Sequence, residues 1–532
     1  MRAVWGRLHF AAVNPTYRRK VITAGVMTGM FLAALEATIV GTAMPTVVAA
    51  VGGLAHFSWV FSAYLLTSTV SVPLWGKLSD LYGRRLFYQL AIAVFLAGSV
   101  LSGVALTMPQ LIAARALQGL GAGGLIPLGM TIIGDIYTLE ERARMQGLFS
   151  GVWGLSSVIG PLIGGFITDQ LSWRWVFFIN VPFGVAAAVI MGIALQEAKP
   201  STRPSIDYLG AATLTAAVTL LLLALVDGAS VAELLAPHNL ALLVAVMALL
   251  AWFVRIERRA KEPVIPLQLF RNRIVSLSMI IGFLAGAAMF GAISFVPLFA
   301  QGSRGVSATA AGSFLTPLML AWVSASIVGG RLLIRVGSRP LVVAGLLFLV
   351  TGFAGLAMAD RQTPTSLLVV ALTVIGVGLG LTMLTLLIAV QHAVPRNQLG
   401  IATSLNQFFR SIGGAMGVAV LGAVLTSGLV ANLRNHPRLT PAQASNLAEN
   451  PSALVSREAQ AAIPPAALGA LQESLAQSTR SVFIACAIVS AIALIFGFFL
   501  PAGRPVEEND GEKFVMAEMT VIDAEHEPVT KD

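Results

Sequence analysis

Long apolar runs separated by short polar segments fill most of the 532-residue chain. A helix of about 20 apolar residues is long enough to cross the hydrocarbon core of a bilayer. Fourteen runs approach or exceed that length, so the pattern predicts an all-α polytopic membrane protein with fourteen transmembrane helices. The predicted helices lie at about 21–46, 57–76, 86–107, 110–134, 145–168, 175–196, 208–227, 238–255, 274–300, 309–330, 340–359, 366–391, 400–429 and 481–500.

The composition also indicates a lipid environment. Hydrophobic residues make up 56% of the chain and charged residues 11%, whereas a soluble domain carries about a quarter charged residues. A chain with so few charges could not cover its surface in water. The first apolar run is longer than the core of a signal peptide, so we expect it to be retained as a helix.

The net charge of +9 bears on orientation rather than on nucleic-acid binding. Most of the 34 lysines and arginines fall in short segments on the same side of the predicted membrane as the N-terminus, with clusters at Arg18–Lys20 and Arg255–Arg273. Lys and Arg concentrate on the cytoplasmic side of membrane proteins. We therefore predict that both termini are cytoplasmic, and we expect no nucleic-acid partner.

Two segments of the chain repeat one another. Gly76–Arg85 follows the second predicted helix and Gly330–Arg339 follows the tenth, with matching Gly, Leu, Gly and Arg positions, although Ile334 replaces Asp80. Parallel repeats of six helices are typical of one large transporter architecture. We expect six-helix bundles at 1–200 and 266–502, inserted helices 7 and 8 at 201–265, an external loop at 430–480 and a disordered acidic cytoplasmic tail at 503–532.

The first copy of the repeat carries charges of both signs. Gly83 permits a tight turn, and Asp80 is suited to a charge-assisted hydrogen bond that breaks when two bundles separate. The segment resembles the cytoplasmic signature G-x-L-[AS]-D-x-x-G-R-[RK] of the major facilitator superfamily. The resemblance implies the major facilitator fold and a conformational latch formed by Gly76, Asp80, Gly83, Arg84 and Arg85. Plain orienting charge is the alternative, but it would not require Asp80.

An arginine lies well inside the fourth predicted helix, where a charge is costly unless it faces a cavity or a partner. Arg115, Gln118, Gly119 and Ala122 share one helix face, and small residues there allow another helix to approach closely. This pattern resembles the arginine motif of the superfamily, which implies that Arg115 and Gln118 take part in proton transfer. A structural arginine bonded to backbone carbonyls is the alternative.

The fifth predicted helix holds a glycine-rich string around Pro161, which removes a helix hydrogen bond and favours a bend. We expect its small-residue face to pack tightly against the opposite bundle. The string resembles the antiporter motif found in exporters of the superfamily, which implies antiport. Simple glycine packing is the alternative. The residues of this motif are Gly154, Gly160, Pro161, Gly164 and Gly165.

Glu36 is the only acid that we place deep inside a predicted helix. The segment Leu35–Pro45 resembles the first-helix motif of the fourteen-span drug:proton antiporter family, and Trp173–Pro182 and Glu262–Asn272 resemble further motifs of that family. The family commonly has Asp in place of Glu36 and Asn in place of Gly41. The resemblance implies that Glu36 carries the proton. A structural ion pair with the arginine of the fourth helix is the alternative.

Four polar or aromatic positions are candidates for the substrate cavity. Gln407 and Arg410 precede a glycine cluster in the thirteenth predicted helix. Arg410 either lines the cavity or pairs with a carbonyl group. Tyr64 and Phe295 are able to contact a lipophilic substrate, although aromatic residues of membrane helices often serve only as interfacial anchors.

The sequence lacks the motifs of other functional classes. It has no G-x-x-x-x-G-K-[ST] loop for ATP, no H-E-x-x-H motif and a single cysteine, Cys486. We therefore expect neither ATP hydrolysis nor a metal or other cofactor, and no enzymatic activity.

The sequence predicts a proton-coupled antiporter that exports lipophilic, cationic drugs by alternating access of two bundles. We expect it to use the proton gradient and to work as a monomer in the cytoplasmic membrane. Export of an endogenous lipid or metabolite is the alternative within transport. A membrane receptor or a membrane enzyme is the alternative from another class, but neither would require the repeat between the two halves.

Overall fold

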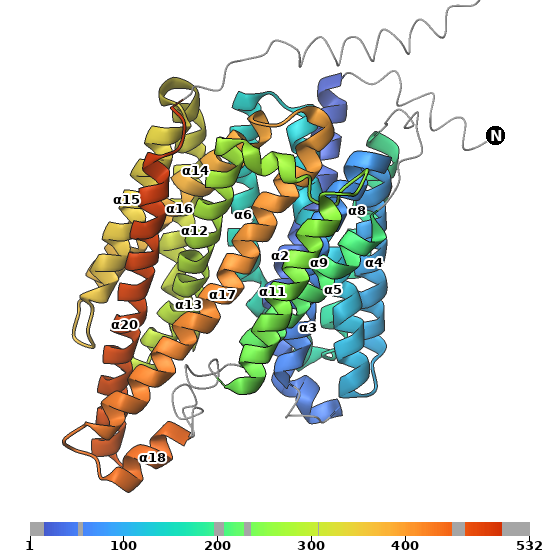
Figure 1. Cartoon of the computed structure of the whole chain (residues 1–532). Coiled ribbons are helices and arrows are strands. Elements are labelled where there is room, and N and C mark those ends of the chain that lie inside the picture. The colour runs from blue at the N-terminus through green and yellow to red at the C-terminus, as the bar shows by residue number, and fades with distance from the viewer. Residues whose placement is uncertain are drawn as a thin grey trace, which may run out of the picture.

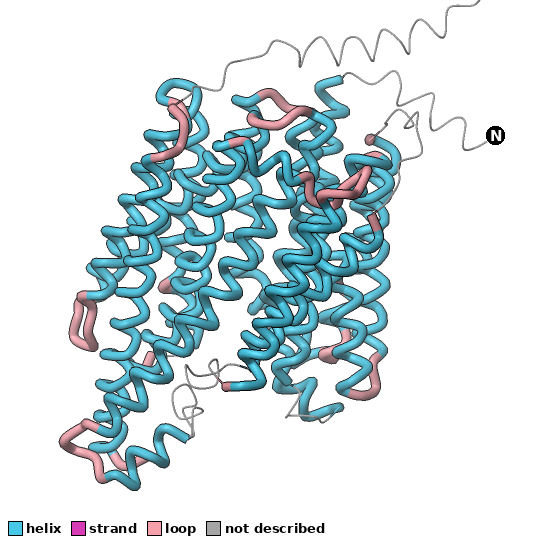
Figure 2. Tube along the Cα trace, in the orientation of Figure 1, coloured by secondary structure: helices cyan, strands magenta, loops and turns pink. Residues whose placement is uncertain are grey.

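The computed structural model consists of long helices joined by short loops (Figures 1 and 2). It describes residues 15–51, 57–195, 207–227, 236–306, 308–449 and 463–502, and these residues include no β-strand. The predicted acidic tail at 503–532 lies outside the described residues. Apolar runs of this kind form helices because a helix satisfies its backbone hydrogen bonds internally, which lipid requires.

The first group of helices packs around two apolar cores. α2 contacts α5, α6 and α8, and α5 also packs against α3 and α4. One core includes Met30, Tyr88 and Phe95, and the other includes Leu35 and Phe177. The helices of this group are α2 (Pro15–Val51), α3 (Phe57–Tyr82), α4 (Arg84–Val104), α5 (Met108–Ile136), α6 (Leu139–Gln170), α7 (Trp175–Phe178) and α8 (Asn180–Ala194).

The second group is built in a similar way. α12 packs against α17 and α20, and α16 packs against α14 and α15. Its largest core includes Phe295, Phe353 and Phe483. The helices are α12 (Arg273–Leu298), α13 (Ala308–Ser313), α14 (Leu315–Val336), α15 (Ser338–Ala357), α16 (Thr365–His392), α17 (Leu399–Arg434), α18 (Pro441–Glu449) and α20 (Pro465–Phe498).

Two further helices, α9 (Tyr208–Asp227) and α11 (Pro237–Glu257), lie between the two groups in Figure 1. α9 contacts α3 of the first group and α17 of the second. A shared apolar core joins Val72 of α3, Val218 of α9 and Leu405 of α17. The predicted inserted helices therefore cover the seam between α3 and α17.

Local sequence signals explain several helix ends. α6 begins with a capping box, in which Thr138 and Glu141 satisfy backbone amides of the first turn. α12 is capped by Asn272, whose side chain accepts a hydrogen bond from the Ile274 amide at 2.9 Å. The turn glycines of the two repeat copies both have positive φ, 101° at Gly83 and 83° at Gly337. Most side chains avoid that conformation, so glycine is needed at both turns.

Each of the fourteen predicted ranges overlaps a helix, or two successive helices, of the described residues. Within those residues, eleven helices are long and apolar enough to cross a membrane, and α9 contributes a shorter apolar helix, Tyr208–Ala224. α3 and α6 are not among the eleven. The count of fourteen crossings therefore stays a prediction.

Two regions that lie outside the predicted helices are largely helical where the structure describes them. The segment Gly76–Arg85 belongs to α3 as far as Tyr82, and only Gly83 separates α3 from α4. In the region 430–480, α17 continues to Arg434, α18 follows, and α20 begins at Pro465 rather than near residue 481. Polar residues can continue a membrane helix beyond the apolar run, so hydropathy alone places these ends too early or too late.

Candidate functional site

Glu36 of α2 and Arg115 of α5 form an ion pair in the interior of the first helix group. The two residues are 0% and 1% exposed. Arg115 also donates from Nη1 to Gln118 Oε1 at 2.6 Å and from Nε to the Val60 carbonyl at 3.4 Å. A buried charge that loses its partner is strongly destabilised. Any change in the charge of Glu36 therefore changes the bonding that Arg115 requires.

A second buried partner reaches Glu36 from α8. The Asn180 side chain donates from Nδ2 to Glu36 Oε2 at 2.6 Å and to Ser99 Oγ at 3.0 Å. Ser99 in turn donates to the Phe177 carbonyl at 2.8 Å. Hydrogen bonds from α5 and α8 thus reach the two carboxylate oxygens from different helices. Asn180 and Ser99 were not predicted as site residues, although polar side chains within apolar runs are the signal that points to them.

Aromatic rings border the arginine of this cluster. The guanidinium carbon of Arg115 lies 4.2 Å from the centre of the Tyr64 ring and 5.9 Å from that of Phe177. At 4.2 Å, a cation over a ring is attracted by the negative face of the π system. Tyr64 is only 6% exposed, so it is part of the buried cluster rather than an interfacial anchor.

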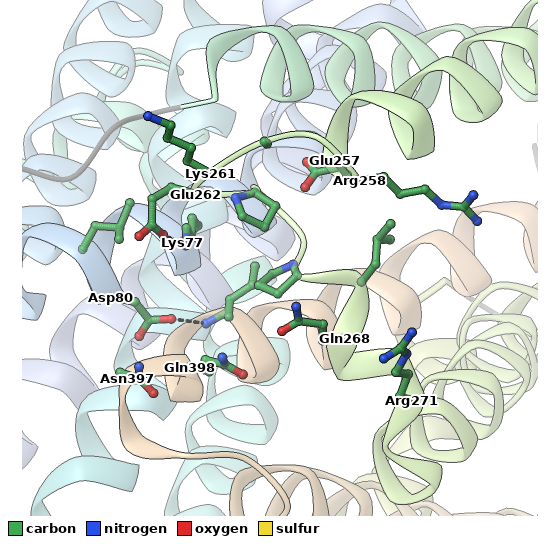
Figure 3. Close-up of a pocket in the computed structure, with 16 residues that line it drawn as sticks. Lys77, Asp80, Glu257, Arg258, Lys261, Glu262, Gln268, Arg271, Asn397 and Gln398 are labelled. Atoms are coloured by element: carbon green, nitrogen blue, oxygen red, sulfur yellow. Dashed lines mark hydrogen bonds and ion pairs between the residues drawn. The ribbon is translucent and has the colours of Figure 1, made fainter.

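The signature segment Gly76–Arg85 meets the beginning of α17 in the second helix group. The Asp80 carboxylate accepts hydrogen bonds from the Gly400 amide at 2.9 Å and from the Ile401 amide at 2.7 Å (Figure 3). The first amides of a helix have no partner within the helix, and the positive end of the helix dipole favours an anion there. Asp80 therefore serves as the N-terminal cap of a helix that belongs to the other group.

Further charges surround this contact. Arg84 forms ion pairs with Asp80 and with Asp135, the latter at 3.1 Å, and donates to Ser79 Oγ at 2.9 Å. Arg85 is half-buried beside it. Gly76 lies so close to α17 that a Cβ atom there would clash with Ser404. Asp80 thus has the charge-assisted bonds that the sequence led us to expect, and they join the two helix groups.

The segment between α11 and α12 reaches the same place. Lys77 forms an ion pair with Glu262 at 2.9 Å. Beside it lies a cavity of about 960 Å³, with walls from α3, from residues 257–271 and from the start of α17. Figure 3 shows Gln268 and Gln398 in the same lower part of the view, below Glu262. The inserted helices are therefore linked to the signature segment at this end of the molecule.

The glycine-rich string of α6 makes its closest contact in an unexpected direction. The atoms nearest to a Cβ placed at Gly160 belong to Thr38 and Ile39 of α2, in the same helix group. Thr38 Oγ1 also donates to the Ser156 carbonyl at 3.0 Å. The expected close packing of Gly160 against the opposite bundle is therefore wrong, because this face of α6 is turned toward α2.

Gly165, at the end of the string, is less closely packed than Gly160. A Cβ at Gly165 would meet no atom within 4 Å, and the Gly164 carbonyl accepts a hydrogen bond from Thr168 Oγ1 at 2.6 Å. α6 continues without a break through Gly154 and Pro161. Other parts of α6 do contact α14 of the second group, so the helix still lies between the two groups.

The structure separates the predicted cavity residues. Tyr64 belongs to the Glu36 cluster, whereas Phe295 is buried in the largest core of the second group. Arg410 on α17 donates to the Gln407 side chain. Gln407 donates from Nε2 to Ser411 Oγ at 3.4 Å. The partner of Arg410 is therefore the side-chain amide of Gln407, one helical turn away on α17.

Comparison with known proteins agrees with this architecture. The family model "Major Facilitator Superfamily" matches residues 26–418. The chain belongs to the major facilitator superfamily. Among solved structures, the human organic anion transporter MFSD10 has a TM-score of 0.58 at 15% identity, covering 89% of this chain and 99% of that one. The proton:xylose symporter XylE has a TM-score of 0.58 at 12% identity, covering 94% and 100%. These two show the shared fold.

Closer relatives are found by sequence. "Multidrug transporter protein MdtP" of Bacillus subtilis is 40% identical over 503 residues, which cover 91% of this chain and 93% of that protein. "Multidrug resistance protein 3" of the same organism is 34% identical and covers 91% and 96%. Membership of the superfamily makes this chain a multi-pass membrane transporter of small molecules rather than an enzyme.

Proposed function

We propose that this transporter exports lipophilic, cationic drugs in exchange for protons. The single observation that carries the proposal is the buried Glu36–Arg115 pair, because an acid inside a membrane bundle is costly and marks an ion or proton pathway. The names of the two Bacillus relatives, both multidrug transporters over nearly the whole chain, support drug export. The ionised Glu36 attracts positive charge, so a proton and a cationic substrate compete for one carboxylate.

The proposed cycle couples the charge of Glu36 to the position of the two helix groups. When Glu36 takes up a proton, the buried Arg115 loses its counter-ion and the balance of the cluster changes. When the proton leaves, the ion pair forms again. The bonds from Asp80 to the start of α17 hold the groups together at one end, so they must break for that end to open. This is alternating access without ATP.

We place the protein in the cytoplasmic membrane, with both termini and the Asp80 contact on the cytoplasmic side, as the Lys and Arg distribution indicates. With this orientation, the bonds between Asp80 and α17 hold the cytoplasmic end of the two helix groups closed. Glu36 would then take up its proton from outside and release it to the cytoplasm after the cytoplasmic side opens.

The proposal is tested with sealed proteoliposomes that carry an imposed pH gradient and a fluorescent lipophilic cation. We expect wild-type protein to move the dye in proportion to the gradient. Glu36→Gln keeps the size of the side chain but cannot take up or release a proton, so gradient-driven flux should fall at least about tenfold. An unchanged thermal melting curve by circular dichroism in detergent confirms that the variant is folded. Full gradient-driven flux in Glu36→Gln would disprove the role of this acid.

A further inference from the structure

The neutral side chain of Asn180 contacts Glu36 but has no role in the proposed exchange cycle. Among the described residues, the titratable groups that face Glu36 are Arg115 from α5 and Tyr64 from α3. α4 contributes Ser99 and α8 contributes Asn180, both neutral and both 0% exposed. α6 meets α2 through the bond from Thr38 to the Ser156 carbonyl. Gln118 of α5 is a further buried neutral side chain beside the carboxylate. Asn180 is the neutral side chain that reaches the carboxylate from α8, with a hydrogen bond of 2.6 Å to Oε2.

The position of Asn180 is held from two sides. It is the first residue of α8 and follows the short helix α7 after one residue, Ile179. Its Nδ2 atom donates one hydrogen to Glu36 Oε2 and the other to Ser99 Oγ. Ser99 is fixed by its own bond to the Phe177 carbonyl. The amide nitrogen is therefore aimed at the carboxylate by its surroundings, and both of its hydrogens are used.

The other end of the same amide is unpaired. Asn180 Oδ1 is buried and has no hydrogen-bond partner among the described residues. A buried acceptor without a donor normally costs about 1–3 kcal/mol, so its persistence in the core calls for an explanation. A protonated carboxyl group has one O–H donor, whereas an ionised one has none. A half-turn of the amide would bring Oδ1 to face that donor.

We infer that Asn180 is a positioning residue for Glu36, whose amide donates to the ionised carboxylate and, after a half-turn, accepts from the protonated carboxyl group. The amide thereby stays bonded to Glu36 throughout the proton cycle. It also sets the pH at which Glu36 changes charge, because the charge-assisted bond to the ionised form is stronger than the bond to the protonated form. This inference rests on the proposed proton exchange, but its first measurement does not depend on transport.

The first measurement is an infrared titration of purified protein in detergent. Protonated carboxyl groups give a distinct C=O band, and the Glu36 band is the one that Glu36→Gln removes. Asn180→Leu removes both the NH2 donor and the C=O acceptor of the side chain while keeping a similar volume. Since a hydrogen bond to the ionised form is lost, we expect the Glu36 band to persist to a pH about one unit higher. An unshifted band in folded Asn180→Leu overturns the inference.

Asn180→Asp supplies a second variant of nearly identical shape, in case the leucine variant does not fold. It replaces the donating amide with a second acid, and two carboxyl groups in contact resist ionising together. The band of Glu36 should therefore shift to higher pH than in wild type. Asn432→Leu is the matched control, because Asn432 also donates to a serine, Ser478 at 3.0 Å, but on the far part of α17 and α20. It should leave the Glu36 band in place.

The second measurement is the pH profile of dye flux in proteoliposomes for the same variants. A parallel shift of the infrared and transport midpoints supports both the inference and the proposed exchange. A shifted infrared midpoint with an unshifted transport profile keeps Asn180 as a positioning residue and contradicts proton exchange through Glu36. A merely structural role would lower the maximal flux without moving either midpoint, and that result would overturn the inference.

Discussion

The two copies of the internal repeat share a backbone but differ in what they join. In the first copy, Asp80 crosses to the second helix group and caps the start of α17 through Gly400 and Ile401. In the second copy, Ile334 occupies the place of Asp80 and packs against the apolar core formed by α14, α15 and α16 in its own group. The turn glycines have positive φ in both. The repeat therefore preserves the turn, and only one copy carries the charge.

The corresponding helices α6 and α17 differ in how their N-terminal amides are capped. When α13 and α14 are counted as one interrupted helix, α17 and α6 are the fifth helices of their groups. α6 satisfies its first amides with its own Thr138 and Glu141, whose carboxylate bonds to the Thr138 amide at 3.0 Å. α17 begins after Gln398 without such a side-chain cap and depends on Asp80. A helix that caps itself does not resist separation of the groups, whereas one that borrows its cap does.

The largest effect within this comparison is expected for Asp80→Asn. The substitution removes the charge that faces both the α17 amides and Arg84, and charge-assisted bonds are about twice as strong as neutral ones. We expect the dye flux in proteoliposomes to fall about tenfold. The matched control is Asp360→Asn, because the Asp360 carboxylate also accepts from two backbone amides, at 2.9 and 2.7 Å, but within its own loop. That control should change flux by no more than about twofold. Equal loss in both variants would contradict the latch.

The next effect is expected for Gly400→Ala. A Cβ at Gly400 would lie against the Asp80 carboxylate and the Arg84 guanidinium, so the cap would have to move away from the helix. We expect a flux loss of about threefold to tenfold and a weaker contact between α3 and α17, measured by cross-linking of cysteine pairs introduced there. Gly422→Ala on the same helix is the control, since a Cβ there meets nothing within 4 Å. A normal cross-linking rate in Gly400→Ala would show that the cap tolerates the methyl group.

These contacts show how far the sequence predicts such a molecule. Apolar runs locate the helices, because lipid allows few other backbone conformations. They do not locate helix ends outside the apolar runs, so α3 extends through the signature to Tyr82 and α20 begins at Pro465. Those extensions are polar or mixed, and their helical form depends on packing rather than on hydropathy.

Some contacts of the candidate site can also be predicted from the sequence, and others cannot. Glu36 and Arg115 are predictable, since each is a rare charge within an apolar run and each needs a partner. The partner of Asp80 is not predictable, because it is a pair of backbone amides at Gly400 and Ile401, and backbone atoms carry no sequence signal. The direction of Gly160 also escapes the sequence. A small-residue face shows that a helix approaches closely, but not which helix it is.

The smallest effect is expected from giving the second copy the acid that it lacks. Ile334→Asp places a carboxylate on α14, but the corresponding helix α6 already bonds its own first amides through Thr138 and Glu141. The new acid therefore has no free helix start to cap. Ile334 is only partly buried, so a carboxylate there can stay hydrated, and we expect dye flux to stay within about twofold of wild type. The combined variant Asp80→Ile with Ile334→Asp exchanges the two residues. It should be as defective as Asp80→Ile alone, because the difference between the copies lies in the capping of α6 and α17 as much as in the acid. Recovery of flux in the exchanged variant would show that either copy can close the transporter.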